Sequence, residues 1–334
     1  MAGMDQSVQV LASLLDTLPP EFVQPEDKQP GATTTFSGAA AATELPLIDM
    51  SMWNAGCCMA EAAREWGIFQ VVNHGVPSEA VAELQRVGRE FFDLPQEEKE
   101  RYALDPASER TEGYGSTLGR EPDDKKVWGD FLFNIVAPPA AVNVEMWPKD
   151  PHGYREANEA YCGHMQRLTR TLLESLSVEL GLEQGAMAEA LGGDDVMFLQ
   201  KINFYPPCPQ PELALGVTPH TDLCALTVLV PNEVQGLQVS KDGHWYDVNY
   251  VHGALIVNIG DQIEIFSNGR YKAALHRAMV SKEKTRMSWP VFLEPPLEQV
   301  VGPHHQLVTD ETPAKYNANT FKHYKYCKFN KLPL

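Results

Sequence analysis

A run of short strand-forming segments between residues 196 and 293 most constrains what this chain can fold into. Apolar and β-branched residues recur there in short stretches, and glycine, proline and asparagine turns separate the stretches. Many short strands with turns between them are typical of a β sandwich or barrel. The predicted strands cover residues 198–205, 226–229, 237–239, 245–247, 254–259, 276–279 and 288–293.

Two candidate metal ligands lie close together in the stretch 217–230, which we also expect to be extended. Alternate side chains of a strand share one face, so His220 and Asp222 would project together. Taken alone, His220 is equally compatible with a structural histidine at a strand end. His276 offers a third donor later in the chain. Two histidines and one carboxylate suit non-haem Fe(II) with coordination positions left open, so the sequence predicts an iron site at these residues.

The short strands and the candidate ligands together indicate a two-sheet β jelly roll. Helices are expected before it, the longest over residues 154–180 with Gly181 at its end. We therefore predict a mixed α/β fold, dominated by a double-stranded β-helix (jelly-roll) core with surrounding helices. Residues 1–195 would form an N-terminal helical and mixed region packing on the core, residues 196–300 the core, and residues 301–334 a C-terminal tail. No linker divides the middle of the chain, so we expect one structural domain overall.

A fixed cation is predicted near the iron ligands. Arg286 and Ser288 are spaced to share one strand face, and they follow His276 in the chain. The planar guanidinium of Arg286 matches a carboxylate, and the hydroxyls of Ser288 and Tyr205 could complete the hydrogen bonding. A 2-oxo acid could thus occupy two open positions on the iron while its far carboxylate meets this cation. Arg286 alone would instead be interpreted as half of a surface ion pair.

Four sequence motifs together resemble those of the plant 2-oxoglutarate/Fe(II)-dependent dioxygenases. The motifs are KINFYPPCP at 201–209, HTD at 220–222, NIGDQ at 258–262 and RMSWPVF at 286–292. Within that family the chain is most similar to the flavonol synthases, through PEFV at 20–23, WGIFQVVNHG at 66–75 and NKLPL at 330–334. The resemblance extends over nearly the whole chain.

The resemblance implies an enzyme that uses Fe(II), 2-oxoglutarate as co-substrate and O₂, with ascorbate as reductant. It assigns the iron to His220, Asp222 and His276, which also makes these the catalytic residues. The 2-oxoglutarate site would comprise Tyr205, Asn203, Arg286 and Ser288.

The subgroup resemblance implies desaturation of dihydroflavonols to flavonols at the C2–C3 bond, with release of succinate and CO₂. Aromatic rings would stack on the flat flavonoid, while a lysine and a glutamate bond its hydroxyls. Without the resemblance, the phenylalanines would be interpreted as core residues. The implied substrate residues are Phe131, Phe133, Lys201, Phe292 and Glu294.

The chain departs from the flavonol synthase pattern near this predicted pocket. Phe131 stands where that subgroup usually has a substrate-contacting histidine, and Asn134 and Asn258 also replace histidines. These changes leave open a related flavonoid dioxygenase activity, such as that of a flavanone 3-hydroxylase or an anthocyanidin synthase. A non-catalytic small-molecule sensor on the same scaffold is the rival from another class.

Composition limits the partners and the compartment. The formal net charge is −18, which opposes binding to nucleic acid and to anionic membranes. The six cysteines have no regular spacing, as expected for reduced thiols in a cytosolic protein. No stretch is long and apolar enough for a membrane span. We expect a cytoplasmic monomer with a small flavonoid as its ligand.

Overall fold

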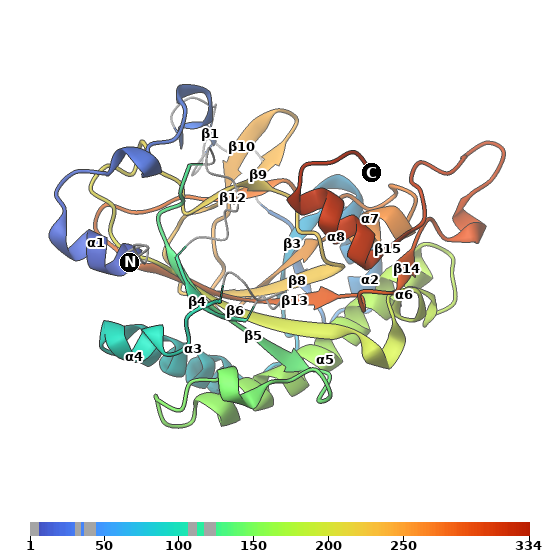
Figure 1. Ribbon diagram of the computed structural model, residues 1–334. Coiled ribbons are helices and arrows are strands. Elements are labelled where there is room, and N and C mark those ends of the chain that lie inside the picture. Colours follow the sequence, from blue (N-terminus) through green and yellow to red (C-terminus); the bar gives the residue numbers. More distant parts are fainter. Residues whose placement is uncertain (1–6, 31–34, 37–44, 106–111, 117–124) are drawn as a thin grey trace.

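The computed structural model describes residues 7–30, 35–36, 45–105, 112–116 and 125–334. Two β-sheets lie at its centre, and helices cover the outer side of the larger one (Figure 1). The fold is mixed α/β with a jelly-roll core, as the density of short strands predicted.

The larger sheet contains eight strands, and several come from segments before residue 196. In order across the sheet they are β2 (Leu47–Asp49), β3 (Ile68–Val72), β11 (Leu255–Ile259), β8 (Leu226–Pro231), β13 (Arg286–Glu294), β6 (Met197–Tyr205), β5 (Asp130–Ala137) and β4 (Gly113–Gly115). From β3 to β4 each strand pairs antiparallel with its neighbour. Strands from before residue 196 therefore form both edges of this sheet. β2 and β3 lie at one edge, and β5 and β4 lie at the other, next to β6.

The smaller sheet contains five strands and carries two of the candidate iron ligands. Its order is β1 (Thr35–Phe36), β10 (His244–Asp247), β9 (Leu237–Lys241), β12 (His276–Ala278) and β7 (Val217–His220). A further pair, β14 (Val300–Val301) and β15 (Asn319–Thr320), lies outside both sheets.

The helices pack mainly against the larger sheet and against one another (Figure 1). They are α1 (Val8–Leu14), α2 (Ala55–Glu65), α3 (Ser78–Asp93), α4 (Gln96–Glu100), α5 (Tyr154–Glu179), α6 (Ala186–Ala190), α7 (Asp261–Phe266) and α8 (Phe321–Phe329). The buried residues of α5, among them Tyr161, Met165, Leu168, Leu172 and Leu176, recur three or four apart and form one face. Each large apolar side chain buried in this way stabilises the fold by about 1.5–3 kcal/mol. Within the described ranges, no helix has the length and apolar character needed to span a bilayer.

Two helices near the core differ from the expectations drawn from the sequence. The segment after β11 forms α7, which is too short to show a helical period in the sequence. The predicted C-terminal tail contains α8, whose buried residues are only Phe321, Tyr324 and Cys327. Most other residues of α8 are polar or charged, so its hydrophobic pattern is weak.

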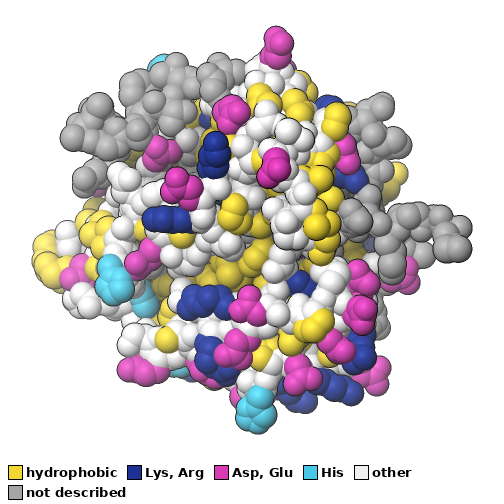
Figure 2. Space-filling model, turned by 90° about the vertical axis from the view of Figure 1, so that its left-hand side faces the viewer, with side chains coloured by type: hydrophobic (Ala, Val, Ile, Leu, Met, Phe, Trp, Pro, Cys, Tyr) yellow, Lys and Arg dark blue, Asp and Glu magenta, His cyan; other side chains and the backbone are white. Residues whose placement is uncertain are grey.

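Figure 2 shows the end of the molecule that lies on the left in Figure 1. Hydrophobic side chains gather toward the centre of this face, and acidic and basic side chains mix around them. Alternate residues of β6 and β13 point between the two sheets, so a pocket is expected between their inner faces.

Candidate active site

The three candidate iron ligands converge between the two sheets. His220 ends β7 and His276 begins β12, and the two residues are direct partners across these antiparallel strands. The strand ends at His220, so the prediction that Asp222 continues it is wrong; Asp222 lies in the following loop. The loop nevertheless brings Asp222 Oδ1 to 3.5 Å from His220 Nε2 and 3.7 Å from His276 Nε2. Ligand atoms of the three residues lie within 4.8 Å of one another, an arrangement that could hold a metal ion.

Hydrogen bonds orient each of these side chains. His220 Nδ1 lies 2.8 Å from the carbonyl oxygen of Thr218, and His276 Nδ1 lies 2.8 Å from that of Ala274. Donation from both Nδ1 atoms leaves both Nε2 atoms free to bind a metal. Asp222 is fixed through its other oxygen, Oδ2. Thr227 donates to it at 2.6 Å and Asn258 at 3.2 Å, so Oδ1 remains directed at the histidines.

The protonation states of these groups suit metal binding. Burial opposes the charge of Asp222, but His276 and His220, when protonated in the absence of metal, and the hydroxyl of Thr227 hold its pKa well below the usual value. Burial and the neighbouring His220 lower the pKa of His276. An ionised carboxylate and a neutral imidazole are the forms that bind a divalent cation.

Arg286 and its neighbours form a polar end of the same cavity. Arg286 is opposite Tyr205, and Ser288 is opposite Asn203, in the antiparallel register of β13 and β6. Arg286 Nη2 donates to the hydroxyl of Tyr250 at 3.2 Å, and Asn203 Nδ2 donates to Ser288 Oγ at 3.2 Å. Burial opposes the charge of Arg286, yet the hydroxyls of Tyr250 and Tyr205 raise its pKa, so it stays protonated.

Two donors of Arg286 remain available for a ligand. Its Nε and Nη1 atoms are buried and have no hydrogen-bond partner within the described part of the chain. A buried charged donor without a partner costs about 1–3 kcal/mol or more, so such atoms rarely persist without a purpose. A carboxylate at the end of the guanidinium would accept from Nη1 and from the second hydrogen of Nη2, which is a bidentate contact. The residues present therefore fit a co-substrate with a terminal carboxylate.

The iron ligands and Arg286 line one cavity of about 80 Å³, which adjoins a larger pocket of about 530 Å³ and shares lining residues with it. Lys201, Asn203, Tyr205 and Val217 line both. Phe292 lines the inner cavity and Phe131 the outer pocket. Together the two spaces can admit a small organic molecule next to the iron ligands.

The candidate substrate residues form two aromatic contacts around this pocket. Lys201 Nζ lies 4.9 Å from the centre of the Phe131 ring, and Phe133 stacks on Phe292 with ring centres 6.1 Å apart. Burial lowers the pKa of Lys201 to about 8. Glu294 and Phe133 do not line either cavity: Glu294 Oε2 lies 3.0 Å from Lys325 Nζ on α8.

Three supporting residues were not found by reasoning from the sequence. Thr227 and Asn258 bond the Asp222 carboxylate, and Tyr250 bonds Arg286. Asn258 and Thr227 are partners across β11 and β8. The strand pairing that brings them beside Asp222 is not visible in the spacing of residues along the chain.

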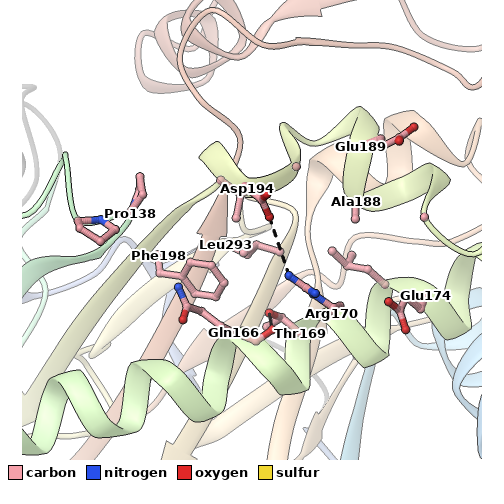
Figure 3. Close-up of a pocket in the computed structure, with 15 residues that line it drawn as sticks. Pro138, Gln166, Thr169, Arg170, Glu174, Ala188, Glu189, Asp194, Phe198 and Leu293 are labelled. Atoms are coloured by element: carbon pink, nitrogen blue, oxygen red, sulfur yellow. Dashed lines mark hydrogen bonds and ion pairs between the residues drawn. The ribbon is translucent and has the colours of Figure 1, made fainter.

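A separate cavity of about 440 Å³ lies between α5, α6 and the ends of β6 and β13 (Figure 3). Arg170 and Asp194 face each other across it at 3.9 Å, and both side chains are largely exposed. None of the candidate iron, co-substrate or substrate residues lines this cavity, so it is not the candidate active site.

Comparison with known proteins decides the family. Residues 194–295 match the 2OG-Fe(II) oxygenase superfamily, and residues 45–151 match the N-terminal region described as non-haem dioxygenase in morphine synthesis. A protein from Petunia hybrida named flavonol synthase/flavanone 3-hydroxylase is 53% identical, covering 98% of this chain and 94% of that protein. The chain belongs to the 2OG-Fe(II) oxygenase superfamily. It is a flavonol synthase-like dioxygenase that uses Fe(II) and 2-oxoglutarate.

Two further relatives support this membership. Flavonol synthase 1 from Crocosmia x crocosmiiflora is 54% identical, covering 98% of this chain and 99% of that protein. The crystal structure of JOX2 in complex with 2OG, Fe and JA has a TM-score of 0.90 and 37% identity, covering 97% of this chain and 93% of that one. The expectation of a dioxygenase is thus confirmed, and a non-catalytic sensor is not supported.

Proposed function

We propose that this dioxygenase desaturates dihydroflavonols to flavonols at the C2–C3 bond and releases succinate and CO₂. The proposal depends on one observation above all: the chain is more than half identical to two proteins named flavonol synthase, and the likeness extends over nearly its whole length. A pocket that joins the candidate iron ligands to several aromatic side chains supports the same substrate class.

In this proposal His220, Asp222 and His276 hold the iron. The two Nε2 atoms and Asp222 Oδ1 face one another, which supports the assignment. When bound, Fe(II) together with 2-oxoglutarate and O₂ supplies the oxidising power for the reaction. The protein's part is to hold the three ligands, and the carbonyl partners of both imidazoles keep the rings in the required tautomer.

Arg286 binds the far carboxylate of 2-oxoglutarate in the same proposal, with Ser288, Tyr205 and Asn203 beside it. Its two unpartnered donors and its charge support this role. Asn203 donates to Ser288 Oγ, so the Ser288 hydroxyl hydrogen can turn toward the carboxylate when 2-oxoglutarate is bound. The clamp would orient the co-substrate before O₂ arrives.

The flavonoid would lie in the pocket between Phe131 and Phe292, with Phe133 behind Phe292. The Phe133–Phe292 stack and the half-buried position of Lys201 support a pocket that limits water around a flat ring. Lys201 would bond a flavonoid oxygen. Glu294 lines neither cavity, so it would act on the substrate from behind the pocket lining, with its carboxylate held by the ion pair with Lys325.

The test is to supply dihydrokaempferol or dihydroquercetin with Fe(II), 2-oxoglutarate and O₂, and to quantify products by mass spectrometry. We expect kaempferol or quercetin and an equal amount of succinate. Omission of 2-oxoglutarate and the Asp222→Ala variant are the controls. If neither substrate yields a flavonol while another flavonoid is oxidised with full coupling to succinate, the desaturase proposal fails.

A second candidate activity is 3-hydroxylation of a flavanone. The petunia relative is named for both flavonol synthase and flavanone 3-hydroxylase, which favours this alternative specifically. The same assay with a flavanone separates the two, because hydroxylation adds an oxygen atom to the product and desaturation removes two hydrogens.

We further propose a cytoplasmic monomer that binds no nucleic acid and is kept active by ascorbate as reductant. Free thiols at Cys57, Cys58, Cys162, Cys208, Cys224 and Cys327 support a reducing compartment. The net charge of −18 supports the absence of a nucleic-acid ligand. Size-exclusion chromatography with light scattering tests the oligomeric state, and fractionation of cells tests the compartment.

A further inference from the structure

The C-terminal helix α8 contacts the loop that carries Asp222. Lys328 on α8 donates from Nζ to Thr221 Oγ1 at 2.7 Å and to Asp261 Oδ2 at 2.6 Å. Thr221 is the residue between His220 and Asp222. A lysine from helix α8 is thus hydrogen-bonded to the residue that lies between two candidate iron ligands in the chain.

Asp261 connects this lysine to the backbone of the same loop. Its carboxylate also accepts from the hydroxyl of Tyr324 on α8 at 2.8 Å. Its backbone N–H donates to the carbonyl oxygen of Asp222 at 2.8 Å. The carboxylate of Asp261 is 9% exposed, and the Lys328 side chain is 34% exposed. The Asp261 side chain therefore joins α8, and its backbone joins the candidate iron site.

The first residues of α7 hold the rest of the loop. The backbone N–H of Gly260 donates to the carbonyl of Ala225 at 2.8 Å, and Gln262 Nε2 donates to the carbonyl of Leu223 at 3.1 Å. A Cβ atom at Gly260 would overlap the Cys224 carbonyl oxygen, so this approach requires glycine. With α7 bonded to its backbone and Lys328 to Thr221, the loop has partners from two helices.

We propose that Lys328 is a positioning residue for the iron site, which it acts on through Thr221 and Asp261. The inference deepens the proposed function, since it depends on His220, Asp222 and His276 being the metal ligands. Without Lys328 the loop keeps its bonds to α7 but loses the bond to Thr221, so Asp222 and His220 hold their separation less firmly. Mutation of residues that orient metal ligands, without binding the metal themselves, commonly lowers metal affinity about 10–100-fold.

The test compares Mn(II) affinity of the metal-free protein and its Lys328→Met variant by titration calorimetry. We expect the dissociation constant to rise about tenfold, near the lower end of that range. The matched control is Lys322→Met on the same helix, because Lys322 is 68% exposed and lies 3.7 Å from the exposed Glu298. The control should bind Mn(II) as the unaltered protein does.

A second variant separates positioning from loss of the fold. Lys328→Met leaves the buried Asp261 charge without its lysine, whereas Lys328→Met with Asp261→Asn removes both charges and should restore the thermal midpoint. Mn(II) affinity should remain lowered in this double variant. Recovery of affinity together with stability would show that Lys328 is only structural, and unchanged affinity in Lys328→Met would also overturn the proposal.

The Asp222→Ala variant distinguishes this proposal from the assignment of the ligands. If Asp222→Ala abolishes Mn(II) binding and Lys328→Met does not weaken it, the ligand set stands and the positioning role is wrong. If Asp222→Ala still binds Mn(II) normally, the ligand set itself is wrong and the positioning role falls with it.

Discussion

Arg286→Lys is expected to weaken 2-oxoglutarate binding about ten- to a hundredfold while metal binding stays intact. Two of its donors, Nε and Nη1, have no partner in the described part of the protein, and Nη2 is bonded to Tyr250. A hydrogen bond to a charged group contributes about 1.5–3 kcal/mol. Lysine keeps the charge but not the fork, so one such bond is lost, and 1.4 kcal/mol corresponds to a factor of about ten.

The assay is titration of 2-oxoglutarate into Mn(II)-loaded protein, after the Mn(II) affinity of each variant has been measured separately. Arg270→Lys is the matched control, because Arg270 is exposed and lies outside the cavity. Ser288→Ala should give a loss near the lower end of that range, about tenfold, since only the acceptor of this bond is charged. Unchanged 2-oxoglutarate affinity in Arg286→Lys, or an equal loss of Mn(II) affinity, would refute the reasoning.

The same geometry predicts a gain in stability when the cation is removed altogether. Unsatisfied buried donors cost about 1–3 kcal/mol, so Arg286→Met should raise the free energy of unfolding of the free protein by about that amount. Urea titration without metal or co-substrate measures it. A clear loss of stability would mean that Arg286 is a structural residue and that its free donors are satisfied in solution.

Four further changes test other parts of the protein. Asp222→Ala should abolish Mn(II) binding and turnover but leave the circular dichroism spectrum unchanged, because the ligands are added to a large core; wild-type turnover would contradict the ligand set. Burial lowers the pKa of Lys201 from 10.5 to about 8, so the unfolded chain binds this proton more tightly than the folded protein does. The free energy of unfolding of the metal-free protein should therefore rise as the pH increases from about 8 to 10.5. Lys201→Met should remove that part of the gain in urea titrations, and identical pH dependence in both proteins would disprove it. Gly260→Ala should destabilise by about 1–3 kcal/mol, because the new methyl group overlaps the Cys224 carbonyl; an unchanged urea midpoint would count against this close contact. Glu294→Gln should lower flavonol yield per succinate more than it lowers 2-oxoglutarate consumption, since Glu294 would position the substrate and not the oxidant; equal losses would exclude that role.

Strand spacing accounts for much of what could be predicted. Arg286 and Ser288 share a strand face because both lie in β13, and the register with β6 places them opposite Tyr205 and Asn203. The jelly roll could be expected from the density of short strands, since their alternation needs two covered faces. In both cases the two-residue alternation of a strand can be recognised in the sequence, and it predicts which side chains share a face.

The rest depends on contacts between distant segments. The sequence predicts that Asp222 lies in a strand, but β7 ends at His220, and bonds to α7 and to Lys328 on α8 shape the loop after it. Helix α8 buries too few residues to show a helical pattern, although it contacts the loop at the candidate iron site. The conformation of such a loop depends on the distant segments that it contacts, and no periodic pattern in the sequence predicts it.

The contact between Phe131 and Lys201 links the departure from the flavonol synthase pattern to the physics of the pocket. The Lys201 ammonium lies 4.9 Å from the centre of the Phe131 ring, where the negative face of an aromatic ring stabilises a cation. A histidine at position 131 would instead offer a hydrogen bond, or a repelling charge when protonated. Phe131 therefore favours a charged Lys201, which in the proposed function would be a hydrogen-bond donor to the flavonoid on this side. Because Phe131 lines the outer pocket and the iron ligands line the inner cavity, we expect Phe131→His to change which flavonoid is oxidised and to leave Mn(II) affinity unchanged.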